Sequence, residues 1–240
     1  MGISIAIAFH SDHGHTARMA HAVAAGAESV AEATAACLPV DAIDEAAWAT
    51  LDAADAIVFG SPTHMGAPSA PFSAFAAATQ GRWLQDRWRN KVAAGFTNSG
   101  TIAGDKLNTL QTFAILAAQH GMVWVGLDLK AGWATSSAGP DDLNRLGSWL
   151  GAMSHSPLDL GPDAAPRRSD LATAEHLGRR VALLARTLRR GRAVEADRVA
   201  ADADARAIGA NRGAADADRG AIDANHGAID ANHGAEVTAP

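Results

Sequence analysis

Short apolar runs alternate with helical stretches over the first 190 residues, and this alternation constrains the fold more than any other feature. The apolar runs span 3–9, 36–40, 55–60, 91–96 and 122–127, and helical patterns cover 15–33, 105–120 and 170–190. Strands that alternate with helices form a parallel sheet with helices on both faces. We therefore predict an α/β protein with a doubly wound, five-stranded parallel sheet.

Two segments depart from this alternation. Residues 130–168 are rich in Gly, Pro and Ser and contain one predicted short helix, 141–153. A connection of this length usually carries function or an interface. The tail, 191–240, contains a seven-residue repeat that ends in two copies of AIDANHG. Each copy has at most one Ile to bury, which does not offset the entropy of ordering. We predict a domain over 1–190 and a disordered low-complexity tail over 191–240.

The charge and cysteine content exclude several classes of function. The formal net charge is −6, and the tail alone carries five Arg against nine acidic residues. The nearly neutral body offers no basic surface for nucleic acid and no strong field for steering a protein partner. A single cysteine, Cys37, excludes an internal disulfide and fits a reducing cytoplasm. The first nine residues read as a core strand rather than a signal peptide, and no apolar run is long enough to span a membrane.

The turn after the first predicted strand reads His10-Ser-Asp-His-Gly-His-Thr16 and leads directly into a helix. Ser11 and Thr16 offer hydroxyl groups, Gly14 allows close backbone approach, and the helix start offers free N–H groups to an anion. The three-glycine dinucleotide pattern and the Walker lysine are absent, so a single phosphate is the expected ligand. The histidines could suggest a metal, but no second ligand cluster follows at zinc spacing, so we predict no metal site. An ordinary strand-to-helix turn remains the alternative.

Two further loops follow predicted strands at the same edge of the sheet. The third strand leads into Gly60-Ser-Pro-Thr-His-Met-Gly-Ala-Pro-Ser69, and the fourth into Thr97-Asn-Ser-Gly-Thr101. Such rigid turns expose backbone N–H and C=O groups to a flat heterocycle, although each alone could be an ordinary turn. Ligands of open parallel sheets bind outside the carboxyl ends of the strands. Three polar, glycine-bearing loops at one edge therefore predict a ligand site there.

These loops, together with Gln119-His-Gly-Met122, resemble those of the flavodoxin-like NAD(P)H:quinone oxidoreductases, also called the tryptophan-repressor-binding-protein family. The resemblance covers residues 3–127 and, more loosely, the last predicted helix. It implies a flavodoxin-like fold that binds flavin mononucleotide (FMN). It places the phosphate at Ser11, His13, Gly14, His15 and Thr16. It places the isoalloxazine and ribityl groups against Pro62, Thr63, His64, Met65, Gly66, Thr97, Asn98, Ser99, Gly100 and Thr101.

The resemblance also implies roles for two residues outside these loops. His120 matches a family histidine near the flavin, where nicotinamide and quinone alternate. At the end of its helix a protonated imidazole is favoured, and we expect it to donate a hydrogen bond to the acceptor; simple helix capping is the alternative. Trp83 resembles a tryptophan that a neighbouring subunit brings to the flavin pocket, which implies a homodimer or homotetramer.

The implied reaction is a two-step transfer in which NAD(P)H reduces FMN and a quinone then reoxidises it. The cofactor carries out the chemistry, and the protein supplies orientation and electrostatics. The resemblance therefore predicts a cytoplasmic, FMN-dependent NAD(P)H:quinone oxidoreductase. A flavodoxin that carries electrons without its own NAD(P)H turnover and a flavin-free interaction module on the same fold are the alternatives.

Overall fold

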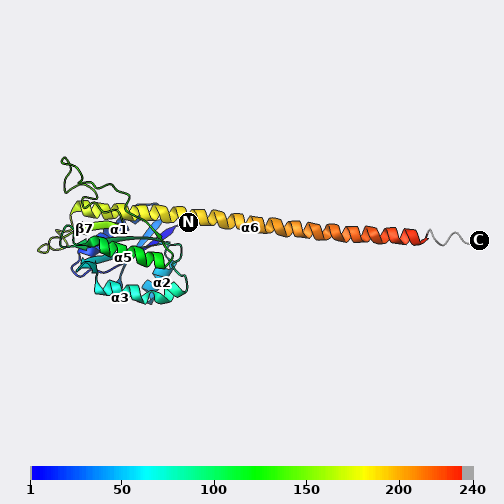
Figure 1. The fold of residues 1–240 in the computed structure, drawn as a ribbon, viewed down its shortest axis with the longest axis horizontal. Coiled ribbons are helices and arrows are strands. Elements are labelled where there is room, and N and C mark those ends of the chain that lie inside the picture. Colours follow the sequence, from blue (N-terminus) through cyan, green and yellow to red (C-terminus); the bar gives the residue numbers. More distant parts are fainter. Residues whose placement is uncertain (1, 234–240) are drawn as a thin grey trace, which may run out of the picture. The chain divides into compact units, whose positions relative to one another are not determined.

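The computed structural model describes the backbone of residues 2–233 and the side chains of residues 2–203 (Figure 1). Its strands are β1 (Ile3–Phe9), β2 (Ala33–Pro39), β3 (Ala56–His64), β4 (Ala67–Pro68), β5 (Val92–Ser99), β6 (Val123–Trp124) and β7 (Ala152–His155). Its helices are α1 (His15–Glu28), the short 3-10 helix η1 (Val40–Ala42), α2 (Glu45–Ala53), α3 (Ala70–Ala78), α4 (Gln80–Leu84), α5 (Lys106–Gln119) and α6 (Arg168–His233). The alternation predicted from the sequence is confirmed, although α2, α3 and α4 carried no pattern clear enough to predict them.

The main sheet is parallel, with the strand order β2-β1-β3-β5-β6. Its fifth position is shared by two short strands. β6 pairs with the beginning of β5 at Val92, and β7 pairs with its end from Phe96 to Ser99. The chain therefore leaves the sheet after Trp124 and returns to the same position at Ala152. The doubly wound, five-position sheet is confirmed, but only two residues of the predicted strand 122–127 pair as a strand.

The predicted helix over 141–153 is wrong. This stretch forms turns and then enters β7. The side chain of Asn144 explains the difference, because it donates to the carbonyl oxygens of Leu129 and Ser148 and accepts from the Ser148 backbone N–H. Asn144 and Gly147 also have positive φ angles of 49° and 66°. Local side-chain bonds of this kind compete with helix formation.

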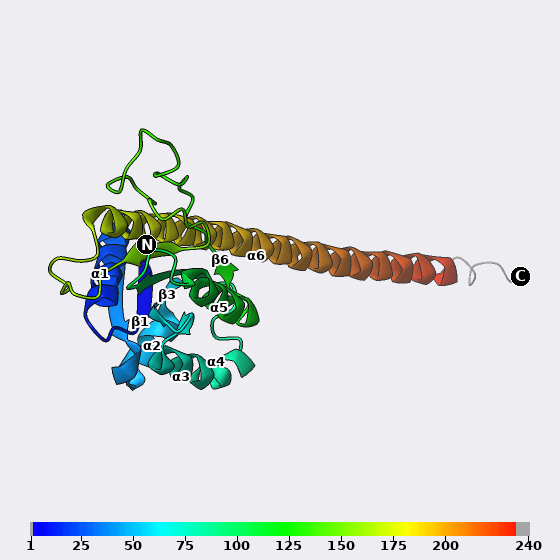
Figure 2. The same ribbon diagram turned by 60° about the vertical axis from the view of Figure 1, so that its left-hand side comes forward.

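Helices cover both faces of the sheet. Buried residues of α1 and of the first part of α6 form one apolar cluster with the strands, and residues of α2, α3 and α5 form the other. Figures 1 and 2 show α1 beside α6, with α2, α3 and α5 on the opposite side. Gly26 and Gly178 bring α1 and α6 into backbone contact, since a Cβ on either glycine would collide with the backbone of the other helix.

Contacts divide the chain into a unit that ends at Arg189 and a second unit that begins at Arg190. The backbone of α6 continues through the repeats to His233, and disorder of the tail in solution stays our prediction. Alanine, the strongest helix former, is the commonest residue of those repeats, which favours a helix even where little can be buried. None of the described helices combines the length and apolar character that a membrane span requires.

Candidate functional site

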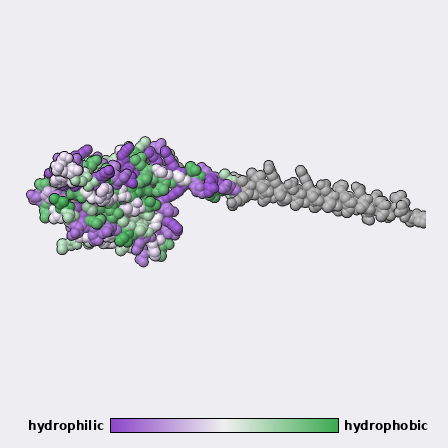
Figure 3. All heavy atoms as spheres, turned by 45° about the horizontal axis from the view of Figure 1, so that its top comes forward, coloured by the Kyte–Doolittle hydropathy of each residue, from purple (hydrophilic) through white to green (hydrophobic). Residues whose placement is uncertain are grey.

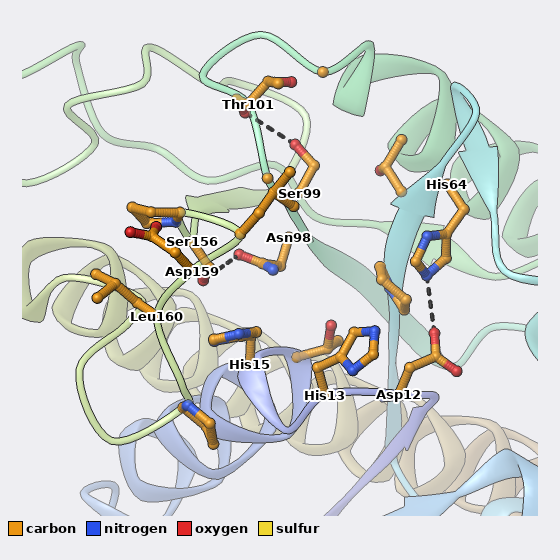
Figure 4. A pocket seen from close by; sticks show the side chains of 18 of the residues that line it. Asp12, His13, His15, His64, Asn98, Ser99, Thr101, Ser156, Asp159 and Leu160 are labelled. Atoms are coloured by element: carbon orange, nitrogen blue, oxygen red, sulfur yellow. Dashed lines mark hydrogen bonds and ion pairs between the residues drawn. The ribbon is translucent and has the colours of Figure 1, made fainter.

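A cavity of about 990 Å³ lies where β1, β3 and β5 end, at the edge of the sheet predicted to bind a ligand. This volume is at the upper end of the range of about 300–1,000 Å³ typical of small-molecule sites. Figure 4 shows the side chains that line it. The predicted residues in its wall are His13, His15, Thr16, Pro62, Thr63, His64, Met65, Gly66, Asn98, Ser99, Gly100 and Thr101. The structure thus brings the three predicted loops together around one space.

The first loop presents backbone donors to this cavity. Gly14 caps α1 with a φ of 82°, and no acidic residue lies in the first turn of the helix. Ser11 and Gly14 are not in the wall: the Ser11 hydroxyl accepts the backbone N–H of Ala17 at 3.1 Å and so completes the helix start. Among the described residues, no acceptor contacts the N–H groups of His15 and Thr16. The start of α1 is therefore a ready anion site.

The second loop is a tight hairpin between β3 and β4. His64 pairs with Ala67, and the two residues between them, Met65 and Gly66, have φ angles of 48° and 79°. Two successive positive φ angles are typical of a type I′ turn. Asn108 of α5 donates to the carbonyl oxygen of Gly66 at 2.7 Å and holds the turn. The Met65 side chain is fully exposed at the tip.

The third loop fixes an amide that points into the cavity. The side-chain oxygen of Asn98 accepts hydrogen bonds from the hydroxyls of Ser154 at 2.7 Å and Ser156 at 3.0 Å. These bonds orient the Asn98 side chain so that its NH₂ group faces the cavity, and no described residue accepts from that group. Thr97 lies behind the wall, where its hydroxyl bonds that of Thr63 at 2.8 Å. Asn98 therefore offers a preorganised donor to a ligand.

The segment 156–162 and the contacts that hold it beside the first loop could not be predicted from sequence patterns. Ser156 to Pro162 forms one side of the cavity, and its end is held by Arg18, which donates to the Pro162 carbonyl oxygen at 2.6 Å. His15 donates from Nδ1 to the Ala165 carbonyl oxygen at 3.0 Å, just beyond this segment. Both partners lie about 150 residues from the first loop in sequence, so local patterns do not reveal the pairing.

The ionisable side chains in the wall of the cavity are carboxylates and histidines. Asp12, Asp105 and Asp159 line the cavity together with three histidines, and no lysine or arginine is among the described lining residues. His64 of β3 contacts the Asp12 carboxylate of the first loop at 2.9 Å, visible as a dashed line in Figure 4. Within residues 2–203 no group of three or more His, Cys, Asp or Glu side chains is arranged so that it could hold a metal ion.

His120 and Trp83 do not line the cavity of their own chain. His120 is buried at the end of α5, bonded to the Thr79 hydroxyl at 2.9 Å and packed on Trp88 with ring centroids 4.6 Å apart. Burial lowers the pKa of His120, which corrects our expectation of a protonated imidazole. Desolvation of the charged form outweighs the helix dipole here. Trp83 lies about half exposed on α4.

The surface around the cavity includes exposed apolar side chains. Met65, Ile102 and Leu158 are among the large hydrophobic residues that are more than half exposed, and two of them line the cavity. Hydrophobic and hydrophilic residues are interspersed over the face of the first unit seen in Figure 3. The site thus combines the free N–H groups at the start of α1, the oriented NH₂ group of Asn98 and exposed apolar side chains, which suits a phosphorylated flat heterocycle.

Known proteins are similar to this chain over most of its length. Residues 10–131 match the family model described as NADPH-dependent FMN reductase. The chain is 40% identical to "Flavodoxin FldP" of Pseudomonas aeruginosa over 185 residues, 76% of this chain and 96% of the relative. It is 32% identical to an "NAD(P)H dehydrogenase (quinone)" of Geotalea uraniireducens over 209 residues, 78% of this chain and 100% of the relative.

A solved structure gives the same assignment. The WrbA-like flavodoxin of Agrobacterium tumefaciens aligns with a TM-score of 0.59 and 40% identity, covering 78% of this chain and 99% of that structure. Identities of this level over nearly whole relatives, together with the family match, establish common descent. The chain therefore belongs to the flavodoxin-like NADPH-dependent FMN reductase family, the group that includes the NAD(P)H dehydrogenases (quinone).

Proposed function

We propose that this chain is an FMN-dependent oxidoreductase that passes electrons from NAD(P)H to a quinone-type acceptor. FMN is the cofactor of its family, and oxidoreductase chemistry is common to its named relatives. The observation that carries the proposal is the pairing of free donors in one cavity: the N–H groups at the start of α1 and the oriented NH₂ group of Asn98. The first group suits a phosphate and the second a ring carbonyl.

The residues present fit FMN in size and in chemistry. His13, His15 and Thr16 would surround the phosphate, with Ser11 and Gly14 shaping the loop from behind. A Cβ on Gly14 would lie 3.0 Å from the Pro162 ring, so this turn closes tightly against the segment on the opposite side. Pro62 to Gly66 would border one side of the ring and Asn98 to Thr101 the other. The bound flavin would supply two-electron transfer, which no side chain provides.

The mouth of the cavity supports a flat, apolar acceptor. Met65 and Leu158 expose apolar surface there, and a large apolar ring can pack on such surface. The relatives named NAD(P)H dehydrogenase (quinone) support a quinone as that acceptor. We also propose a cytoplasmic location, because a protein with a single free thiol, Cys37, fits a reducing compartment.

Assembly into a homodimer or homotetramer is also part of the proposal. Trp83 is about half exposed and lies outside the cavity of its own chain, so it is free to reach the cavity of a neighbouring copy. His120 is buried, and it would have to break its hydrogen bond to Thr79 before it could reach the cavity of a neighbouring copy. The exposure of Trp83 therefore makes it the better candidate for such a contribution.

A second candidate function is electron transfer without NAD(P)H turnover, because a relative at 40% identity carries the name flavodoxin. Anaerobic absorption spectroscopy separates the two. The purified protein, loaded with FMN, is mixed with NADH or NADPH, and a quinone is then added. Bleaching of the flavin bands by the nicotinamide and their return with the quinone is the expected result. Bands that persist with both nicotinamides would favour the electron carrier, and failure to bind FMN would refute both.

A further inference from the structure

Lys106 lies directly behind the wall of the cavity and is completely buried. It is the first residue of α5, and its ammonium group donates three hydrogen bonds. The acceptors are the Ser99 hydroxyl at 2.9 Å, the Thr101 carbonyl oxygen at 2.7 Å and the Ile102 carbonyl oxygen at 2.9 Å. Ser99 and Thr101 both line the cavity. The positive charge is thus one hydrogen bond away from the lining residues.

The charge of Lys106 has no carboxylate counterpart among the described residues. All three of its acceptors are neutral oxygens, and no ion pair involves its ammonium group. Asp170 is the acidic group whose charge raises the pKa of Lys106, but the Arg145 guanidinium binds both oxygens of that carboxylate at 2.8 and 2.7 Å. Buried charges in proteins are normally paired.

The position of Lys106 at the start of α5 adds a second energetic cost to that of burying a charge without a carboxylate partner. A cation is unfavourable in the first turn of a helix, where the dipole is itself positive. Burial lowers the pKa of Lys106 to about 8, with the Arg145 charge acting in the same direction and Asp170 opposing it. A neutral residue would pack here without these costs. A positive charge at this buried position therefore points to a negative charge that is supplied from the cavity.

We propose that Lys106 is the counter-charge for the flavin ring when that ring is reduced. The inference rests on the proposed function. Transfer of a hydride, which is two electrons with one proton, to a neutral ring leaves one net negative charge on the ring. A cation close to a flavin stabilises that charge and favours reduction. No lysine or arginine lines the cavity within the described residues. Lys106, which bonds Ser99 and Thr101 of the lining, is therefore the cation positioned to stabilise the charge of the reduced ring.

The test compares how tightly the protein binds oxidised and reduced FMN. Dissociation constants for both forms are measured anaerobically on the wild type and on Lys106→Met, together with the midpoint potential of the loaded proteins. We expect Lys106→Met to weaken reduced FMN about tenfold more than oxidised FMN. For a two-electron couple this ratio corresponds to a potential lower by about 30 mV. Lys130→Met is the matched control, because it removes the same charge from an exposed position.

A dependence on pH gives a second readout. The difference between wild type and Lys106→Met should narrow as the pH rises above about 8, where the ammonium group becomes neutral. The other charged or titratable groups near Lys106 are Asp105 beside it, Arg145 of the segment before β7, His155 of β7, and Asp170 of α6. All of them are present in both proteins, so the comparison isolates Lys106.

The outcomes separate this inference from the proposed function. Equal weakening of both flavin forms would show that Lys106 only supports the loop, and unchanged binding would show no role; either result overturns the inference while the proposed function stands. A wild type that binds no FMN overturns both. If Lys106→Met does not fold, Lys106→Gln, which keeps a donor but not the charge, replaces it in the same comparison with the same criteria.

Discussion

At the scale of single residues, Asn98 allows the sharpest test of the cavity. Asn98→Asp keeps an oxygen for the hydroxyls of Ser154 and Ser156 but replaces the free NH₂ donor with an acceptor. We expect FMN affinity to fall about tenfold or more, because one neutral donor is lost and a negative charge faces the ligand; the lost bond alone accounts for about 0.5–1.5 kcal/mol. Quenching of flavin fluorescence measures the affinity. Gln111→Glu makes the same chemical change on an exposed position of α5 and should leave it unchanged.

His120 predicts a pH dependence of stability. Its Nε2–H donates to Thr79, whose own hydroxyl donates to Ala76, so Nδ1 is the atom that would take a proton. Nδ1 is buried without a partner, and burial lowers the pKa of His120 below its unfolded value. A lowered pKa in the folded state means that the contribution to stability is complete above about pH 6.5 and is lost as the pH falls.

We therefore expect the melting temperature to fall between pH 7 and pH 5, and His120→Gln to reduce that fall, since glutamine keeps a donor for Thr79 and does not titrate. Thermal unfolding followed by circular dichroism measures the slope. Part of the slope should remain, because burial also lowers the pKa of His155 and His176. An exposed variant, His21→Gln, serves as the control. The same slope in wild type and His120→Gln would contradict the assignment.

Among the elements, the turn into α1 depends on a glycine. Gly14 has a φ of 82°, and a Cβ there would lie 3.0 Å from Pro162. Gly14→Ala should lower the free energy of unfolding by about 1–2 kcal/mol through the left-handed backbone alone, and it should weaken FMN binding as the loop shifts. Urea unfolding measures the first effect. Gly81→Ala in α4 has open space and should gain up to about 1 kcal/mol. A neutral Gly14→Ala would mean that the turn adapts freely.

The insertion that interrupts the fifth position of the sheet is anchored by a buried ion pair. Arg145 binds Asp170 at 2.7 Å, and the same carboxylate accepts the His155 backbone N–H of β7. Arg145→Met should cost about 3–5 kcal/mol in urea unfolding, because it leaves Asp170 buried and unpaired. Arg145→Met with Asp170→Asn should cost less than the sum of the single changes. Arg167→Met breaks the exposed pair with Asp141 and should cost at most about 1 kcal/mol.

The elements also show which parts of the site the sequence can predict. The loops after β1, β3 and β5 follow their strands directly, so strand order and spacing alone assign their glycines and hydroxyls to one sheet edge. β7 escapes such an assignment, because its four residues pair with β5 about 56 positions away and carry no periodic pattern. In the sequence nothing distinguishes Lys106 from a surface lysine, and only the folded structure shows that it lies behind Ser99. Contacts over such separations are set by the whole fold.

For the whole molecule, the cavity belongs entirely to the first unit. All of its lining residues lie between Asp12 and Pro162, and that unit ends at Arg189. A chain that ends at Arg190 should therefore bind FMN with a dissociation constant within about twofold of the full chain. Fluorescence titration of both proteins measures this. A loss of tenfold or more would show that the tail takes part in the site or in the assembly that completes it.

Two opposing effects determine the helix content of the tail, residues 191–240. Its alanines favour the helical backbone that continues to His233, but each repeat also contains a glycine, which costs about 1 kcal/mol in a helix, and offers almost nothing to bury. In proteins most of the stability of a helix comes from packing of its apolar face rather than from helix propensity. We therefore expect a peptide of residues 191–240 to be mainly unfolded by circular dichroism. Replacing Gly213, Gly220 and Gly227 with Ala should increase its helix content strongly. A native peptide that is already helical at all concentrations would show that alanine propensity dominates, and helix that grows with concentration would show self-association.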